Sequence, residues 1–249
     1  MIPSIIHRRL TVLVRFTLLV IAFTSCSQSR ELTVVQLVFP DGRVVSVRLP
    51  SELAEASSRE LTFYVQQGSY QALVVVTDDR EERRAAGTGE PVSVAGTATD
   101  WRLVRGEMGL VDRIIQPTGR WSVVIGLPMS LRNPEAAASL VKVVEHDGLP
   151  AIELGDGTRI GDSQLEEPTW RYTVTGGEWT LTAISSCDNR PRIVGDTSLE
   201  WCDAELGLHL HAFGDRQLVL QIRDSLEIIV PFVGSSRSDE SASRVARLG

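Results

Sequence analysis

Short runs of β-branched and alternating hydrophobic residues, separated by turn-forming residues, recur along most of the chain. Residues 32–39 and 43–49 flank Pro40-Asp41-Gly42, which predicts a hairpin. Two more strand pairs are predicted, around Gln67-Gly68-Ser69 and around Gly176-Gly177. The remaining runs predict strands at 91–98, 101–105, 110–115, 121–126, 151–154 and 158–160, and a closing three-strand meander at 206–213, 217–223 and 226–232.

Signals for helices are few. Asn133, Pro134 and Glu135 form a typical helix start, with a capping side chain, a proline in the first turn and an acidic residue near the positive end of the helix dipole. They predict a helix over 134–146, ended by Asp147-Gly148. A shorter helix is predicted after Ser51, and the charged segment 78–91 is predicted to be a loop.

These patterns predict a mostly β fold. The count of short strands with regular turns favours an antiparallel β-sandwich or a partly open barrel with one or two short helices, over residues 27–233. One β-domain and two smaller ones both remain open. Residues 234–249 are polar and lack periodicity, which predicts a disordered tail.

The first 26 residues have the pattern of an export signal. Basic residues precede a largely apolar run over 16–23, which is too short to span a bilayer. The run ends at Phe23-Thr24-Ser25-Cys26, which resembles the lipobox of bacterial lipoproteins. That resemblance implies that Cys26 is diacylated on its sulfur and becomes the new N-terminus. The alternative is an ordinary cleaved signal, or an uncleaved anchor, with Cys26 incidental.

The cysteine count agrees with lipidation. The chain has three cysteines, Cys26, Cys187 and Cys202. If Cys26 carries lipid, the other two form an even pair, and a disulfide between them would contribute about 3 kcal/mol in the chain-entropy model. An oxidising compartment outside the membrane would preserve this bond. The alternative is two unrelated buried thiols.

Composition and charge exclude one class of function. The chain has 249 residues, 43% of them hydrophobic, with 25 basic and 32 acidic residues and a formal net charge of −7. Loss of residues 1–26 would remove three arginines and no acidic residue, which makes the charge −10. A nucleic-acid binder needs a basic face to displace phosphate counterions, so we expect no nucleic-acid partner.

Familiar catalytic motifs are missing from the sequence. The single lysine, Lys142, excludes a P-loop, and the sequence contains no nucleophile elbow and no Cys-x-x-Cys or His-Glu-x-x-His zinc motif. Ser139 and Lys142 match the Ser-x-x-Lys pattern of penicillin-binding enzymes. Those enzymes also need a Lys-Thr-Gly strand, which a chain with one lysine does not have, so we interpret the match as chance.

The best metal candidate is the pair His209 and His211. Residues two apart on a strand point to the same side, so both imidazoles could face one ion, with Glu205 as a further ligand. The more ordinary interpretation is a polar stripe that faces solvent. The tryptophans Trp121, Trp170 and Trp179 could form a sugar-stacking platform, but their apolar neighbours favour the core.

We therefore expect a lipid-anchored protein on the extracytoplasmic side of a bacterial cell membrane. It would bind a protein partner, an envelope component or a small ligand without catalysis and without a cofactor. The first alternative is a secreted metal-dependent hydrolase that uses His209 and His211. The second is a structural or assembly accessory of the envelope.

Overall fold

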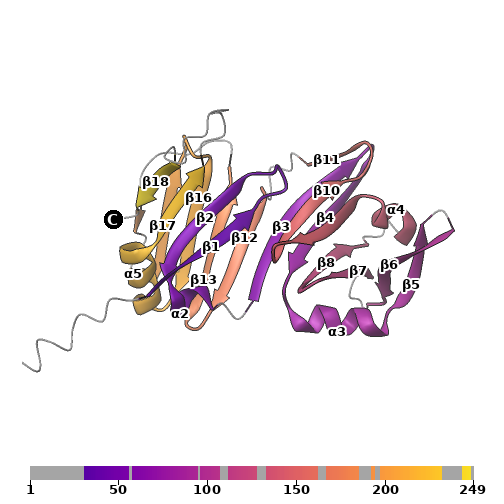
Figure 1. The fold of residues 1–249 in the computed structure, drawn as a ribbon, viewed down its shortest axis with the longest axis horizontal. Coiled ribbons are helices and arrows are strands. Elements are labelled where there is room, and N and C mark those ends of the chain that lie inside the picture. Colours follow the sequence, from indigo (N-terminus) through magenta and orange to yellow (C-terminus); the bar gives the residue numbers. More distant parts are fainter. Residues whose placement is uncertain are drawn as a thin grey trace, which may run out of the picture. The chain divides into compact units, whose positions relative to one another are not determined.

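The computed structural model describes residues 31–55, 58–94, 96–106, 112–127, 133–161, 167–184, 192–193, 197–231 and 243–247. Apart from Glu31 and Leu32, all of them belong to one compact unit formed by residues 33–249. Antiparallel strands dominate this unit, and its described residues form four short helices and sheets that are not closed into a barrel (Figure 1). The predicted fold class is confirmed, in its β-sandwich form.

The larger sheet contains twelve strands. Eleven of them follow the spatial order β14 (Arg192–Ile193), β15 (Ser198–Asp203), β16 (Leu208–Gly214), β13 (Gly177–Ala183), β12 (Thr169–Val174), β3 (Ser58–Gln67), β4 (Tyr70–Thr77), β8 (Trp121–Gly126), β7 (Arg113–Thr118), β6 (Thr97–Val104) and β5 (Glu90–Val94). The twelfth, β11 (Thr158–Ile160), pairs with β3 outside this path.

Two smaller sheets and four helices complete the described part of the fold. One sheet has the order β1 (Leu32–Val38), β2 (Val44–Pro50), β17 (Glu227–Pro231) and β18 (Ser243–Arg247), so β1 is an outer strand. The other sheet is the hairpin β9 (Val141–His146) and β10 (Leu149–Leu154). The helices are α2 (Ser51–Ala54), α3 (Arg80–Thr88), α4 (Pro134–Ala138) and α5 (Arg216–Ser225).

One hydrophobic core joins the four-stranded sheet to the larger sheet. Leu37 and Val47 from the smaller sheet belong to the same buried cluster as Trp170 and Leu181 from the larger one. The Trp170 Nε1 group donates to the carbonyl oxygen of Val38 at 3.2 Å, where the β1–β2 hairpin crosses β12 (Figure 1). Each fully buried large apolar side chain of this kind contributes about 1.5–3 kcal/mol.

The aromatic side chains form the centre of this core. Trp121, Trp170 and Trp179 are each at most 2% exposed, which confirms the core prediction. Trp121 packs edge-to-face on Trp170 with 5.8 Å between ring centroids, and Tyr172 stacks on Trp179 at 4.2 Å. Contacts of this type add about 0.5–1.5 kcal/mol beyond burial. These four aromatic side chains, in contact one after another, link strands β8, β12 and β13.

The segment 78–91, predicted to be a loop, contains helix α3. Asp79 caps it by accepting a hydrogen bond from the backbone N–H of Glu81 at 2.8 Å. Ala86 packs with Ile115 and Val124 in a second small core, so α3 covers a face of the sheet at β7 and β8 (Figure 1). The apolar contacts of α3 with the sheet come from small alanines, and its other contacts are polar, such as the ion pair of Glu82 with Arg113 on β7, which is why the sequence resembles a loop.

The helix predicted over 134–146 is much shorter. Asn133 accepts hydrogen bonds from the backbone N–H groups of Glu135 and Ala136, as expected for a cap, but α4 ends at Ala138. Residues 141–146 form strand β9, in which the buried valines Val141 and Val143 lie on either side of the exposed Lys142, the alternation of a strand. Asp147 and Gly148, with φ of 51° and 78°, are the two residues of the β9–β10 hairpin turn.

The strand predicted over 217–223 is wrong, because these residues lie in helix α5. Asp215 caps the helix by accepting from the backbone N–H of Leu218 at 2.8 Å. Leu218, Val219 and Ile222 are buried at helical spacing. The apolar residues of this short run therefore repeat with the period of a helix, and not with the two-residue period of a strand.

Three predicted hairpins are confirmed. Strands β1 and β2 meet at Pro40-Asp41-Gly42, β3 and β4 at Gln67-Gly68-Ser69, and β12 and β13 at Gly176-Gly177. Within the predicted tail 234–249, Ser243–Arg247 form β18, which pairs antiparallel with β17. This pairing uses backbone hydrogen bonds, which need no hydrophobic periodicity. The rest of that tail lies outside the described residues.

Candidate functional site

The candidate site is a cleft beside β1 that contains two arginines. Its volume is about 440 Å³. We call it the arginine cleft. It is lined by Thr33, Val34, Val35 and Gln36 of β1, Ser51 and Ala54 of α2, Glu55, Arg59, Arg120, Asp147 and Leu149.

Arg59 is held in place by an aspartate on the neighbouring strand. It lies near the start of β3, and Asp78 follows the end of β4. The backbone N–H of Arg59 donates to Asp78 Oδ1 at 2.8 Å, and its Nε donates to Asp78 Oδ2 at 2.7 Å. The side chains are only 21% and 17% exposed, so this charge-assisted pair fixes the direction of the guanidinium group.

Arg120 reaches the cleft from the turn between β7 and β8. The preceding Gly119 has φ of 55°, and a Cβ atom there would collide with the Glu145 carboxylate. That carboxylate accepts the backbone N–H of Arg120 at 2.7 Å. Glycine is therefore favoured at the turn, and Glu145 fixes the backbone from which the Arg120 side chain projects.

Both guanidinium groups lie against the same tryptophan. The Cζ atoms of Arg59 and Arg120 are each 5.1 Å from the ring centroid of Trp121. Trp121 is 1% exposed, and its Nε1 donates to the carbonyl oxygen of Gly148 at 3.1 Å. A cation over an indole face gains about 0.5–1 kcal/mol at exposed sites. Trp121 therefore holds two positive charges close together.

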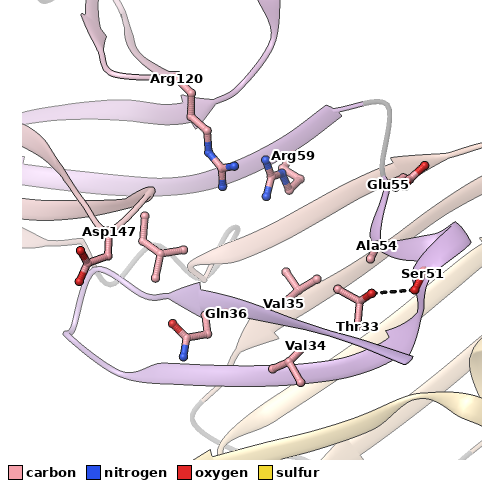
Figure 2. A pocket seen from close by; sticks show the side chains of 11 residues that line it. Thr33, Val34, Val35, Gln36, Ser51, Ala54, Glu55, Arg59, Arg120 and Asp147 are labelled. Carbon is pink, nitrogen blue, oxygen red and sulfur yellow. Dashed lines mark hydrogen bonds between the residues drawn. The ribbon is translucent and has the colours of Figure 1, made fainter. Parts of the chain in front are cut away.

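The charges around the cleft are unequal. Arg59 is neutralised by Asp78, whereas the exposed guanidinium of Arg120 has no ion pair within the described part of the chain. Figure 2 shows the two guanidinium groups directed toward the space beside β1, with the Asp147 and Glu55 carboxylates pointing away from them. A guanidinium group has five N–H donors, and at Arg59 the Nε and Nη2 groups already contact Asp78, so Arg120 is the main donor for an anionic group.

Tyr172 lies beneath this site. It is opposite Arg59 in the β3–β12 register and is buried. Burial raises the pKa of the Tyr172 hydroxyl well above its ordinary value, and the positive charge of Arg59 opposes this shift by a smaller amount. Tyr172 is therefore an uncharged neighbour of Arg59 under physiological conditions, and it does not itself line the cleft.

The metal ligands of the alternative interpretation are only partly brought together. His209 and His211 share the solvent-facing side of β16, as expected, but His209 Nε2 lies 3.1 Å from Glu200 Oε1 on β15. Glu205 lies in the turn before β16, not on the strand. Across the described residues, no group of three or more His, Cys, Asp or Glu side chains is placed to hold a metal ion.

The remaining sequence candidates have simple structural roles or lie outside the described residues. Ser139 ends α4, whereas Lys142 lies on β9 and pairs with Glu153 at 3.3 Å, so the two do not share a helix face. Cys202 on β15 is disulfide-bonded. Cys26 and Cys187 lie outside the described residues, so both the lipidation and the Cys187–Cys202 pairing stay predictions.

Neither arginine of the cleft was singled out from the sequence. One signal was present, because Gly119-Arg120-Trp121 places a cation between a turn glycine and a core tryptophan. Arg59 gave no local signal, since it is brought to Trp121 only when β3, β4 and β8 pair in register.

Among the described residues, no helix has both the length and the apolar composition needed to cross a bilayer. A comparison with protein-family models, with curated proteins and with solved structures finds no match to this chain.

Proposed function

We propose that this chain is a lipid-anchored extracytoplasmic protein that binds an anionic ligand in the arginine cleft without transforming it. The observation that carries the binding part is the pair Arg59 and Arg120, held over Trp121 within one cleft. The anchoring part rests on the basic leader, the apolar run and Cys26.

The disulfide at Cys202 supports the extracytoplasmic location. Disulfides persist in oxidising compartments and are rare in the cytosol, where thiols are kept reduced. Lipid on Cys26 would then place the folded unit on the membrane through two acyl chains, which hold firmly where a single chain is a marginal anchor.

The chemistry of the arginines supports binding in preference to turnover. A guanidinium group stays protonated at every physiological pH, so it neither donates nor accepts a proton in a reaction. Its planar set of N–H donors matches the two oxygens of a carboxylate or the oxygens of a phosphate. Val35 and Leu149 add apolar surface beside the charges, which suits a ligand that combines an acidic group with an apolar part.

The binding proposal is tested by titrating the soluble chain, without residues 1–26, with succinate and with inorganic phosphate. We expect a saturable change in tryptophan fluorescence, because the cations that contact Trp121 would be redistributed. Arg120→Gln should weaken binding about threefold or more, the loss of one charge-assisted contact. The matched control Arg84→Gln removes an exposed charge on α3, outside the cleft lining, and should leave binding unchanged. Equal effects of the two variants would disprove the proposal.

The anchoring proposal is tested by measuring the intact mass of the full chain recovered from the producing cell. We expect a mass that lacks residues 1–25 and carries diacylglycerol on Cys26, with the protein in the membrane fraction. Cys26→Ser should release the chain from that fraction. Retention of the leader, or an unmodified thiol at Cys26, would contradict anchoring and leave the binding proposal standing.

A further inference from the structure

The outer edge of β1 borders the arginine cleft. Four consecutive residues of β1 line the cleft, namely Thr33, Val34, Val35 and Gln36. Successive side chains of a strand point to opposite faces, so a cavity that touches four in a row lies along the edge of the strand. β1 is the outer strand of its sheet, with β2 as its neighbour in the described residues.

Only the end of this edge is occupied among the described contacts, where the Val38 carbonyl accepts from Trp170, and the strand lacks two common protective devices, charge and proline. Proteins commonly block such edges with lysine and other charged residues, or with proline. The β1 sequence contains none of these, and Val34 is 51% exposed. An unpaired row of backbone N–H and C=O groups accepts an added strand, in which backbone hydrogen bonds give affinity and side-chain pockets give specificity.

The charges beside the edge indicate the chemistry of the added strand. Arg59 and Arg120 lie on one side of the cleft and β1 on the other, so a strand laid along β1 would bring alternate side chains toward the guanidinium groups. The chain without residues 1–26 carries a net charge of −10, which repels acidic partners at long range. Screening over about 8 Å at physiological ionic strength weakens this repulsion, so the contact depends on the charges of the cleft, where Arg120 is the arginine that no ion pair neutralises among the described residues.

We propose that an extended acidic segment of a partner protein pairs with the free edge of β1 and places a carboxylate against Arg59 and Arg120. This inference rests on the proposed anion-binding function and names its ligand class. A second copy of the chain is the less suitable occupant, because residues 32–38 carry no carboxylate to offer the arginines.

The test uses a fluorescein-labelled nonapeptide of alternating threonine and aspartate as the probe. We expect saturable binding, and at least a tenfold loss when asparagine replaces aspartate, because each neutralised carboxylate loses a charge-assisted pair. Arg120→Gln should weaken binding about threefold or more, while Arg84→Gln leaves it unchanged. Hydrogen exchange should show new protection of the β1 amides within residues 32–38.

Two further peptides separate strand addition from charge binding. Each carries N-methyl groups on the amides of one edge, which blocks backbone pairing and keeps every carboxylate. We expect at least one of them to lose about tenfold in affinity. If both bind as the unmodified peptide does, strand addition is overturned while anion binding stands. If succinate, phosphate and all peptides fail to bind, both proposals fall. Dimerisation through β1 without peptide, seen by sedimentation, would assign the edge to a second copy and overturn the inference.

Discussion

Asp78 holds the guanidinium group of Arg59 through two nitrogens, with Nε at 2.7 Å and Nη2 at 2.6 Å from the same carboxylate oxygen. The backbone N–H of Arg59 donates to the other oxygen, and the backbone N–H of Asp78 donates to the Arg59 carbonyl. One acidic residue therefore joins the start of β3 to the end of β4 and aims a cation at Trp121.

Asp78→Ala is predicted to destabilise the fold by about 1–3 kcal/mol, because it leaves a largely buried guanidinium without its partner. Urea unfolding measures the change. Glu153→Gln is the matched control, because it breaks the ion pair with Lys142 where both side chains are at least 60% exposed. Exposed pairs contribute about 0–1 kcal/mol, so this variant should unfold nearly as the parent does. Equal losses in the two variants would show that Asp78 has no special structural role.

Asp147→Asn is predicted to raise the affinity of the arginine cleft for anions. Asp147 lines the cleft and has φ of 51°, a conformation that asparagine adopts readily before glycine in a hairpin turn. Asp147→Asn should therefore change the free energy of unfolding by no more than about 0.5 kcal/mol. Loss of the negative charge should strengthen succinate binding about two- to threefold, because it removes a Coulomb repulsion between Asp147 and the anion.

Asp156→Asn serves as the control for that substitution. Asp156 is an exposed turn residue outside the cleft lining, and its replacement changes the net charge by the same amount. If both variants strengthen binding equally, the gain comes from overall charge and not from the cleft.

Tyr172 is predicted to make the fold less stable at high pH. Burial raises the pKa of its hydroxyl in the folded state, so the unfolded chain loses the proton first, above pH of about 10. The free energy of unfolding should be unaffected by this group below that pH and should fall above it by about 1.4 kcal/mol per pH unit. Tyr172→Phe should remove this part of the slope.

The control for this pH dependence is Tyr70→Phe, which removes a hydroxyl from a side chain that is 47% exposed. Urea unfolding between pH 9 and pH 11 compares the three proteins. An unchanged slope in Tyr172→Phe would mean that the hydroxyl ionises equally in the folded and unfolded states.

The sequence predicted those elements in which local patterns and tertiary contacts agree. The turn at Pro40-Asp41-Gly42 and the Asn133 cap carry their own conformational preferences, so both appear where expected. Asp147-Gly148 was identified as a boundary but assigned to the wrong structure. A positive-φ pair ends a helix and also closes a hairpin, and only the pairing of β9 with β10 decides between them.

The candidate site was beyond prediction for a different reason. Arg59 and Arg120 are 61 positions apart in the sequence, and strand pairing brings Arg59 to Trp121, the residue that follows Arg120. No spacing rule along the chain relates residues that are joined only by sheet pairing. Helix α5 shows the same limit on a smaller scale. Leu218 and Ile222 are spaced as on one face of a helix, but only their burial in the core distinguishes that spacing from a strand pattern.

The last prediction concerns the disulfide of Cys202. Its partner is either Cys187 or Cys26, since the chain has no other cysteine. A bond to Cys187 should contribute about 3 kcal/mol, so reductant or the Cys187→Ala, Cys202→Ala double variant should lower the urea midpoint clearly. Proteolysis without reductant should release one cross-linked pair of peptides containing positions 187 and 202. A cross-link from Cys202 to Cys26 would contradict lipidation as well, because a sulfur held in a disulfide has no thiol left to acylate.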